Sequence, residues 1–268
     1  MKYAAKISYD GSYFYGWQTQ KGFISVQESL EKGLTKINGN IPVVVAGAGR
    51  TDTGVHAKAQ VCSFEMQKEW DTTKMLLAIN SNISKGMSVM EIAKVSEEFH
   101  ARFDAKEREY RYFIWNANTI YPHIKPYACW LKQTSYNWDR AKEACKYLIG
   151  EHDFSAFCRQ VDKPKNTIKT IYSAEIIQTG NMLTFRIIGS GFLTNMVRII
   201  IGNLEQIARG IHEPEWIKEL YSAGKTRGDC GRTFPPNGLF LWKINYGINL
   251  WNTHQNNILM YNNIIDDE

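Results

Sequence analysis

The sequence of 268 residues has no long hydrophobic run and no closely spaced cysteines. Its most apolar stretch, Val197 to Leu204, is far shorter than the roughly 20 residues that a membrane-spanning helix needs. The N-terminal residues MKYAAKISYDG lack the apolar core of a cleavable secretory signal. Five cysteines stand singly, without the C-x-x-C spacing of a zinc ribbon, and isolated thiols are typical of a reducing compartment. We therefore expect a cytoplasmic protein with no membrane segment and with reduced, mostly buried thiols.

Motifs for metals and nucleotide cofactors are missing as well. The six histidines are scattered without the H-E-x-x-H spacing of a zinc enzyme, and the zinc signature of nucleic-acid deaminases is absent. Two short glycine segments, GAG at 47–49 and GSG at 189–191, lack the third glycine of a dinucleotide-binding loop. The sequence thus predicts no metal site and no cofactor.

Positive charge is in modest excess, with a net charge of +5, and 44% hydrophobic content is ample for a packed core. Part of the charge lies in two short segments that can line a groove able to neutralise phosphates. Taken alone, each cluster fits a solvated strand or loop face equally well. The two clusters are Arg102, Lys106, Arg108 and Arg111, and Arg159, Lys163, Lys165 and Lys169.

Apolar periodicity predicts an α+β chain with two halves of similar element order. We expect halves at 1–105 and 106–247, followed by an Asn-rich tail at 248–268 that is either flexible or a short surface helix. The predicted strands are 2–9, 42–46, 59–66, 88–95, 107–115, 168–178, 182–188 and 239–245. The predicted helices are one that Ser25 and Glu28 cap, and 72–80, 138–148, 192–209 and 214–223.

The segment AGAGRTDTGVHA, Ala46 to Ala57, places Asp52 between two glycines and close to a cation, Arg50. Glycines allow a tight turn that can aim a carboxylate at a substrate. A carboxylate that loses its hydration in a cleft needs a cation nearby to compensate. An isolated GRTD would more often be an ordinary surface turn. The longer string therefore decides how this turn is interpreted.

This longer string resembles the active-site motif of the tRNA pseudouridine synthase A family. Further blocks follow the order of that family and extend the resemblance from Lys2 to about Tyr246. They are YDGSYFYGWQTQ with SVQESLE, FHARFDAKEREYRYFIWN, GFLTNMVRIIIGNL and PPNGLFLWKINY.

The resemblance implies a fold, an activity and a set of site residues. The fold would be two ferredoxin-like halves whose antiparallel sheets join, with helices beside them and a basic central cleft. Asp52 would be the catalytic residue, Arg198 its ion-pair partner, and Tyr110 the aromatic residue that stacks on a flipped uridine and assists proton removal. Arg50 would occupy or clamp the space that the flipped nucleotide leaves. The other residues expected to bind substrate are Thr51, Gly54 and His56, with Arg102, Arg108 and Arg111.

The same resemblance implies a homodimer that converts uridine to pseudouridine at positions 38 to 40 of tRNA, in the anticodon stem-loop. The residues leave several alternatives open. Tyr112 lies two residues from Tyr110 on the same predicted strand face, and an Arg198 without the resemblance would be an exposed surface residue. Attack of Asp52 on the base or on the sugar, a non-catalytic tRNA-binding module, and a paralogue that modifies other RNA uridines all remain possible interpretations.

Overall fold

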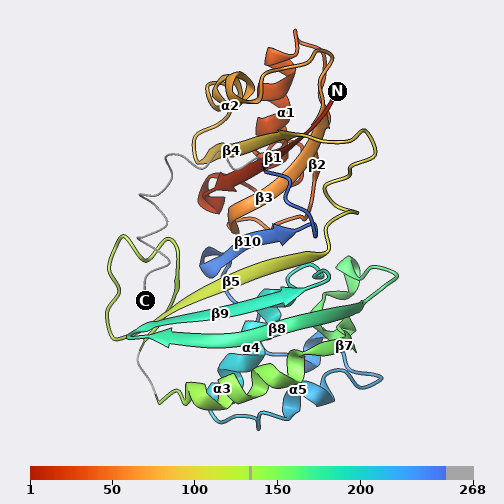
Figure 1. Cartoon of the computed structure of the whole chain (residues 1–268). Helices are drawn as coiled ribbons and strands as arrows, with labels where there is room; N and C mark the ends of the chain where they lie inside the picture. Colours follow the sequence, from red (N-terminus) through yellow and green to blue (C-terminus); the bar gives the residue numbers. More distant parts are fainter. Residues whose placement is uncertain (133–134, 252–268) are drawn as a thin grey trace.

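The structure, a computed structural model, describes residues 1–132 and 135–251. It is a mixed α+β fold built on one large, mostly antiparallel sheet with few helices (Figure 1). The strands are β1 (Lys2–Tyr9), β2 (Ala46–Gly47), β3 (His56–Glu65), β4 (Met87–Lys94), β5 (Glu107–Asn116), β6 (Cys129–Leu131), β7 (Gly150–Asp153), β8 (Ile168–Thr179), β9 (Met182–Gly189) and β10 (Leu239–Asn245). The α-helices are α1 (Val26–Ile37), α2 (Thr72–Asn80), α3 (Trp138–Cys145), α4 (Met196–Ala208) and α5 (Trp216–Glu219).

The last strand, β10, joins the two parts of the sheet. The strand order is β4-β1-β3-β10-β5-β9-β8-β7, with β2 added to β3 and β6 to β5. β10 pairs in parallel with the start of β3, where Phe240 lies opposite His56, and antiparallel with β5, where Leu241 lies opposite Tyr110. β10 therefore links the start of β3, just after the Asp52 turn, to β5, the strand that carries Tyr110.

The helices divide between the two ends of the sheet. In Figure 1, α1 and α2 lie near β1, β3 and β4, while α3, α4 and α5 lie near β8 and β9. Helix α4 is buried on almost every side. The backbone at Arg232 packs closely against Gly202 in the middle of this helix, where any larger residue would clash, since a Cβ on Gly202 would lie 1.9 Å from the Arg232 carbonyl oxygen. Gly202 and Glu205 are among the buried residues of this helix.

Several predicted elements match the structure. β1, α2 and β10 have the predicted bounds, and β3, β4, β5, β8 and β9 differ from theirs by a few residues at most. α1 begins after Ser25, whose hydroxyl accepts a hydrogen bond from the Glu28 backbone N–H at 3.2 Å. These elements have long apolar periods or a capping residue, which are strong local signals.

The predicted strand at 42–46 is largely wrong, because only Ala46 and Gly47 form β2. The preceding backbone bonds to helix side chains instead of a neighbouring strand. The N–H of Val43 donates to the Thr35 hydroxyl, and that of Val45 donates to the Glu31 carboxylate. Alternating apolar residues here pack beside α1 without sheet pairing.

Three helix predictions need shorter bounds. α4 begins at Met196 because Asn195 has a left-handed backbone, with φ 62°, which interrupts a right-handed helix. α3 ends at Cys145 and is followed by a 3₁₀ turn, and α5 covers only Trp216–Glu219 of the predicted 214–223. The short strands β6 and β7 were not predicted, since strands of three and four residues carry little periodicity.

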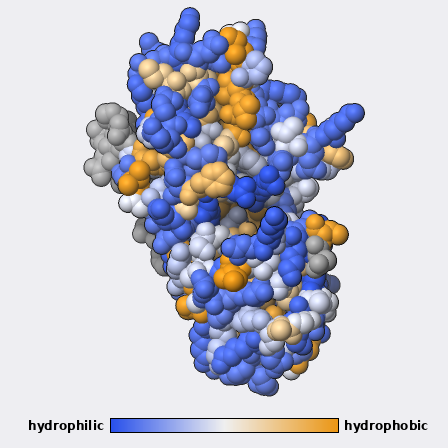
Figure 2. All heavy atoms as spheres, turned by 90° about the vertical axis from the view of Figure 1, so that its right-hand side faces the viewer, coloured by the Kyte–Doolittle hydropathy of each residue, from blue (hydrophilic) through white to orange (hydrophobic). Residues whose placement is uncertain are grey.

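Other features of the chain can be compared with expectation. All five cysteines are free, and only Cys230 is partly exposed. No helix among the described residues is long and apolar enough to cross a membrane. The face of the molecule in Figure 2 is mostly hydrophilic, with hydrophobic residues in small separate groups. The prediction for the Asn-rich tail concerns mainly residues 252–268, which lie outside the described residues.

Candidate active site

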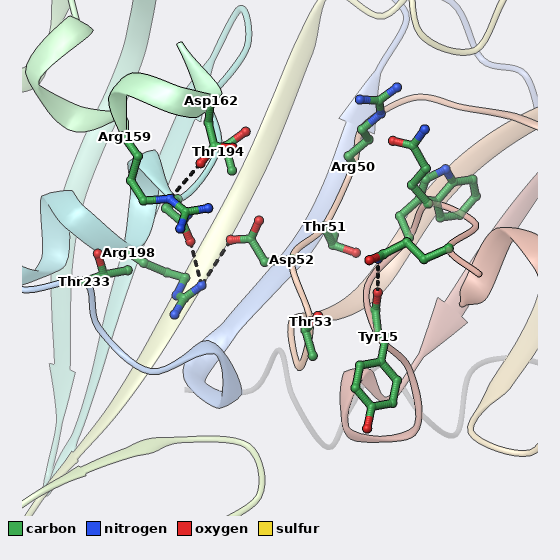
Figure 3. Close-up of a pocket in the computed structure, with 14 residues that line it drawn as sticks. Tyr15, Arg50, Thr51, Asp52, Thr53, Arg159, Asp162, Thr194, Arg198 and Thr233 are labelled. Atoms are coloured by element: carbon green, nitrogen blue, oxygen red, sulfur yellow. Dashed lines mark hydrogen bonds and ion pairs between the residues drawn. The ribbon is translucent and has the colours of Figure 1, made fainter. Parts of the chain in front are cut away.

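A cavity of about 720 Å³ opens where the Asp52 turn faces the start of α4 (Figure 3). One side is formed by Tyr15 and the segment that follows it, together with the turn from Arg50 to Thr53. The other side is formed by Asn195 and Arg198. Its volume falls within the range of about 300–1,000 Å³ that is usual for small-molecule sites. The cavity thus brings together loop and helix residues that are far apart in the sequence.

The turn that carries Asp52 is closed by its own backbone. The N–H of Val55 donates to the Asp52 carbonyl oxygen at 3.1 Å, and Gly54 has φ 78°, a left-handed value that glycine adopts at little cost. A Cβ on Gly54 would also lie 2.9 Å from the Pro236 side chain. Gly54 is therefore needed for backbone geometry and close packing.

Neighbouring residues hold this turn from outside. The Tyr9 hydroxyl lies 2.8 Å from the Thr51 hydroxyl, and the backbone N–H of Trp17 donates to the Thr51 carbonyl oxygen at 3.1 Å. The Gln60 amide donates to the Gly49 carbonyl oxygen at 2.8 Å. A turn with this many fixed hydrogen bonds presents its carboxylate in a defined direction.

Arg198 meets Asp52 across the cavity. Its Nη1 lies 3.1 Å from Oδ2 of Asp52, and the side chains are 15% and 28% exposed. The Nε–H of Arg198 donates to the Phe234 carbonyl oxygen at 2.6 Å. Figure 3 shows both side chains pointing toward one another from opposite sides of the cavity. Arg198 is therefore not the idle surface residue that its sequence position alone would suggest.

Tyr110 lies buried beside the turn, and its ring packs edge-on against Phe192. A Cβ on Gly49 would lie 3.8 Å from its hydroxyl. Burial, and then the negative charge of Asp52, raise the pKa of Tyr110, so its phenol is neutral. Tyr112, the alternative, is fully buried and donates its hydroxyl to the Pro235 carbonyl oxygen at 2.7 Å. Of the two, Tyr110 is the one whose pKa is raised by the charge of Asp52.

Arg50 and His56 flank the Asp52 turn in different ways. Arg50 lines the cavity, but in Figure 3 its side chain extends away from Asp52. His56 is buried, accepts a hydrogen bond from the Gly11 N–H at 3.0 Å, and stacks on Phe240. Burial lowers the pKa of His56, which favours its neutral form. Its contacts are those of a residue that organises the loop.

Three predicted arginines do not line the cavity. The Arg108 guanidinium donates to the backbone carbonyls of four residues. Arg111 pairs with Glu109 at 2.9 Å and lies over the Trp242 ring, on the sheet face opposite Tyr110. Arg102 is exposed. Their binding of RNA stays a prediction.

Part of the cavity wall comes from residues that were not among the predicted site residues. Arg159 and Asp162 line it and form an ion pair at 2.7 Å. Arg159 belongs to the second basic cluster, which was a usable signal. Asn195, directly before Met196, was not predicted as a site residue either. The Phe234 carbonyl that holds Arg198 gave no signal, because a backbone acceptor is the same in every residue.

Comparison with known proteins decides the family. The family model described as tRNA pseudouridine synthase matches residues 5–104 and 144–247. The chain belongs to the tRNA pseudouridine synthase family. A protein of Bacillus licheniformis named tRNA pseudouridine synthase A is 40% identical over 250 residues, which cover 92% of this chain and 99% of that protein. A protein of the same name from a Thermoanaerobacter species is 40% identical, covering 90% and 97%, and one from Geobacillus kaustophilus is 38% identical, covering 90% and 92%.

Membership of the tRNA pseudouridine synthase family confirms the resemblance inferred from the sequence blocks. It also confirms the choice of an enzyme, an isomerase, over a binding module. Among residues 1–132 and 135–251, no group of three or more His, Cys, Asp or Glu side chains could hold a metal ion.

Proposed function

We propose that this chain isomerises uridine to pseudouridine in tRNA and that Asp52 carries the reaction. The observation that supports this best is the ion pair between Asp52 and Arg198 within the cavity. A carboxylate fixed on a closed turn, paired with a guanidinium and still partly open to solvent, is equipped to react with a bound nucleotide.

The reaction needs little besides a positioned carboxylate. The bond between N1 of uracil and C1′ of ribose breaks, the base turns, and C5 bonds to C1′. The proton on C5 leaves and N1 ends with a proton, so no atom is gained or lost overall. Asp52 acts as a nucleophile or base at C6 or at C1′. Tyr110 contacts the flipped base and begins the reaction as a neutral phenol.

The proposed substrate is the anticodon stem-loop of tRNA, at positions 38 to 40. A uridine in a stem must be extruded to reach a catalytic group. Arg50 and Arg159 line the cavity and can meet phosphates near the extruded nucleotide. We further propose that the sheet comprises two ferredoxin-like halves around a basic cleft, and that the enzyme works as a homodimer in the cytoplasm.

The central test replaces Asp52 by Asn, which keeps the shape of the side chain and removes its charge. We expect the Asp52→Asn variant to bind a tRNA transcript with near wild-type affinity and to form no pseudouridine. Asp71→Asn is the matched control, because Asp71 caps α2 outside the cavity and Asn caps a helix equally well. Pseudouridine formed by the Asp52 variant would refute its catalytic role.

Two further measurements refine the proposal. RNA that contains 5-fluorouridine should give a slowly resolved product or adduct with the wild-type enzyme and not with Asp52→Asn. Mapping of pseudouridines in RNA from cells with and without the gene should show loss at tRNA positions 38 to 40. Losses confined to other positions would contradict the proposed substrate while leaving the role of Asp52 intact.

A further inference from the structure

Asn195 has an uncommon backbone conformation at the edge of the cavity. Its φ is 62° and its ψ is 0°, and among the described non-glycine residues only Asn40 also has a positive φ. It precedes α4 as the N-cap residue, yet its side chain makes no capping hydrogen bond. Asn at this position usually accepts a hydrogen bond from the first turn of the helix. Its amide is therefore used for something other than capping.

The amide oxygen instead holds Arg198. Oδ1 of Asn195 accepts a hydrogen bond from Nη1 of Arg198 at 2.7 Å, and the same nitrogen lies 3.1 Å from Oδ2 of Asp52. Since Nη1 carries two hydrogens, it can serve both acceptors. The Nε–H is bound separately to the Phe234 carbonyl oxygen. Acceptors at two nitrogens fix the plane of the guanidinium as well as its position.

We propose that Asn195 is a positioning residue that orients Arg198 toward Asp52. An arginine side chain has many rotamers, and a single contact with a carboxylate would leave several of them open. The added contacts select one rotamer before substrate arrives, so no reorganisation is needed during the reaction. This inference rests on the proposed role of Asp52 and extends it to the residue whose amide holds Arg198.

The residue type at position 195 follows from two requirements. A left-handed backbone is readily adopted only by Gly, Asn and Asp. Gly has no acceptor, and Asp would place a second carboxylate beside Arg198, where it would compete with Asp52 for the same positive charge. Asn combines the backbone tolerance with a neutral acceptor, and so it holds the guanidinium without neutralising it.

The decisive variant is Asn195→Gly, since glycine is at ease at this φ and the change removes only the amide. Because the variant loses a hydrogen bond to the charged Arg198, we expect its kcat on a tRNA transcript to fall by about ten- to a hundredfold. The acidic limb of the kcat–pH profile should also move to higher pH, because a poorly oriented guanidinium stabilises the carboxylate charge less. Asn195→Asp should move that limb in the same direction.

Asn40→Gly is the matched control, because Asn40 has φ 64° and lies after α1, outside the cavity. It should keep the wild-type kcat and pH profile. Wild-type kcat in Asn195→Gly, or a loss of kcat with an unchanged pH profile, would overturn the positioning role. Asp52→Asn is measured in parallel. If it stays active, the proposed function fails; if it is inactive while Asn195→Gly behaves as wild type, only the present inference fails.

Discussion

Arg198→Ala should reduce turnover strongly while leaving tRNA affinity nearly intact. The Arg198 side chain is 15% exposed and its Nη1 lies 3.1 Å from Oδ2 of Asp52, so its loss leaves a partly buried carboxylate without its cation. Two unit charges about 4 Å apart attract by about 4 kcal/mol at an effective dielectric constant of about 20. Desolvation and water that enters the cavity offset part of this attraction. A net loss of about 2–3 kcal/mol corresponds to about a 30- to 150-fold lower kcat.

Arg198→Lys should fall between the wild type and the Ala variant. Lysine keeps the charge, but one ammonium group cannot reproduce the planar fork that serves Asp52, Asn195 and the Phe234 carbonyl together. We expect a loss of roughly tenfold. Single-turnover formation of pseudouridine in a tRNA transcript separates this step from product release.

The control for the Arg198 series is Arg209→Ala, at the end of the same helix. Arg209 is 53% exposed and lies 3.9 Å from Glu205, a buried carboxylate that keeps its contacts with Arg232 and Tyr136, so the removal of Arg209 should leave turnover unchanged. A turnover in Arg198→Ala within a factor of about three of wild type would show that the ion pair contributes less than about 1 kcal/mol. The electrostatic argument for this site would then be refuted.

Three further predictions test the surroundings of the site. Tyr110→Phe should lower kcat by about a hundredfold or more, because the proposed proton transfer loses its hydroxyl. Tyr112→Phe should instead lower the free energy of unfolding by about 1 kcal/mol in a urea titration, because a partly buried hydrogen bond to the Pro235 carbonyl oxygen is lost. Gly202→Ala forces a Cβ to 1.9 Å from the Arg232 carbonyl oxygen, and should lower both the thermal midpoint and kcat. Burial lowers the pKa of His56 below the value of about 6.5 that it has in an unfolded chain. Just below pH 6.5 the unfolded chain therefore binds a proton on His56 that the folded protein does not bind. The thermal midpoint should therefore fall as pH drops below about 6.5, and His56→Gln should fall less.

The predictable parts of this molecule are those with a local cause. Asp52 was singled out as a candidate by the resemblance of the string around it to a family motif, and the bounds of β1, α2 and β10 follow from apolar periods and flanking polar residues. The segment at 42–45 misled the sequence analysis because its partners are the side chains of Thr35 and Glu31, which no period reveals. Local patterns report what a segment can form, and distant partners decide whether it does.

The parts that escaped prediction concern how the site is held together. The left-handed backbone of Asn195 shortened a helix whose apolar pattern is continuous, and the Phe234 carbonyl that fixes Arg198 has no sequence signature. Both constraints act on Arg198 and neither acts on Asp52 directly. The candidate carboxylate could thus be proposed from the sequence, while the geometry of its cation required the fold.

Asp52 and Arg198 are 146 residues apart in the chain, and β10 is the strand that joins their two parts of the sheet. β10 lies between β3, which follows the Asp52 turn, and β5, which leads through β9 toward α4. Among the described residues, β10 contributes none that line the cavity. Its pairing therefore sets the distance between the two charges without taking part in their chemistry. A site of this construction exists only in the completed sheet, so loss of the C-terminal strand removes the ion pair even though both charged residues remain in the chain.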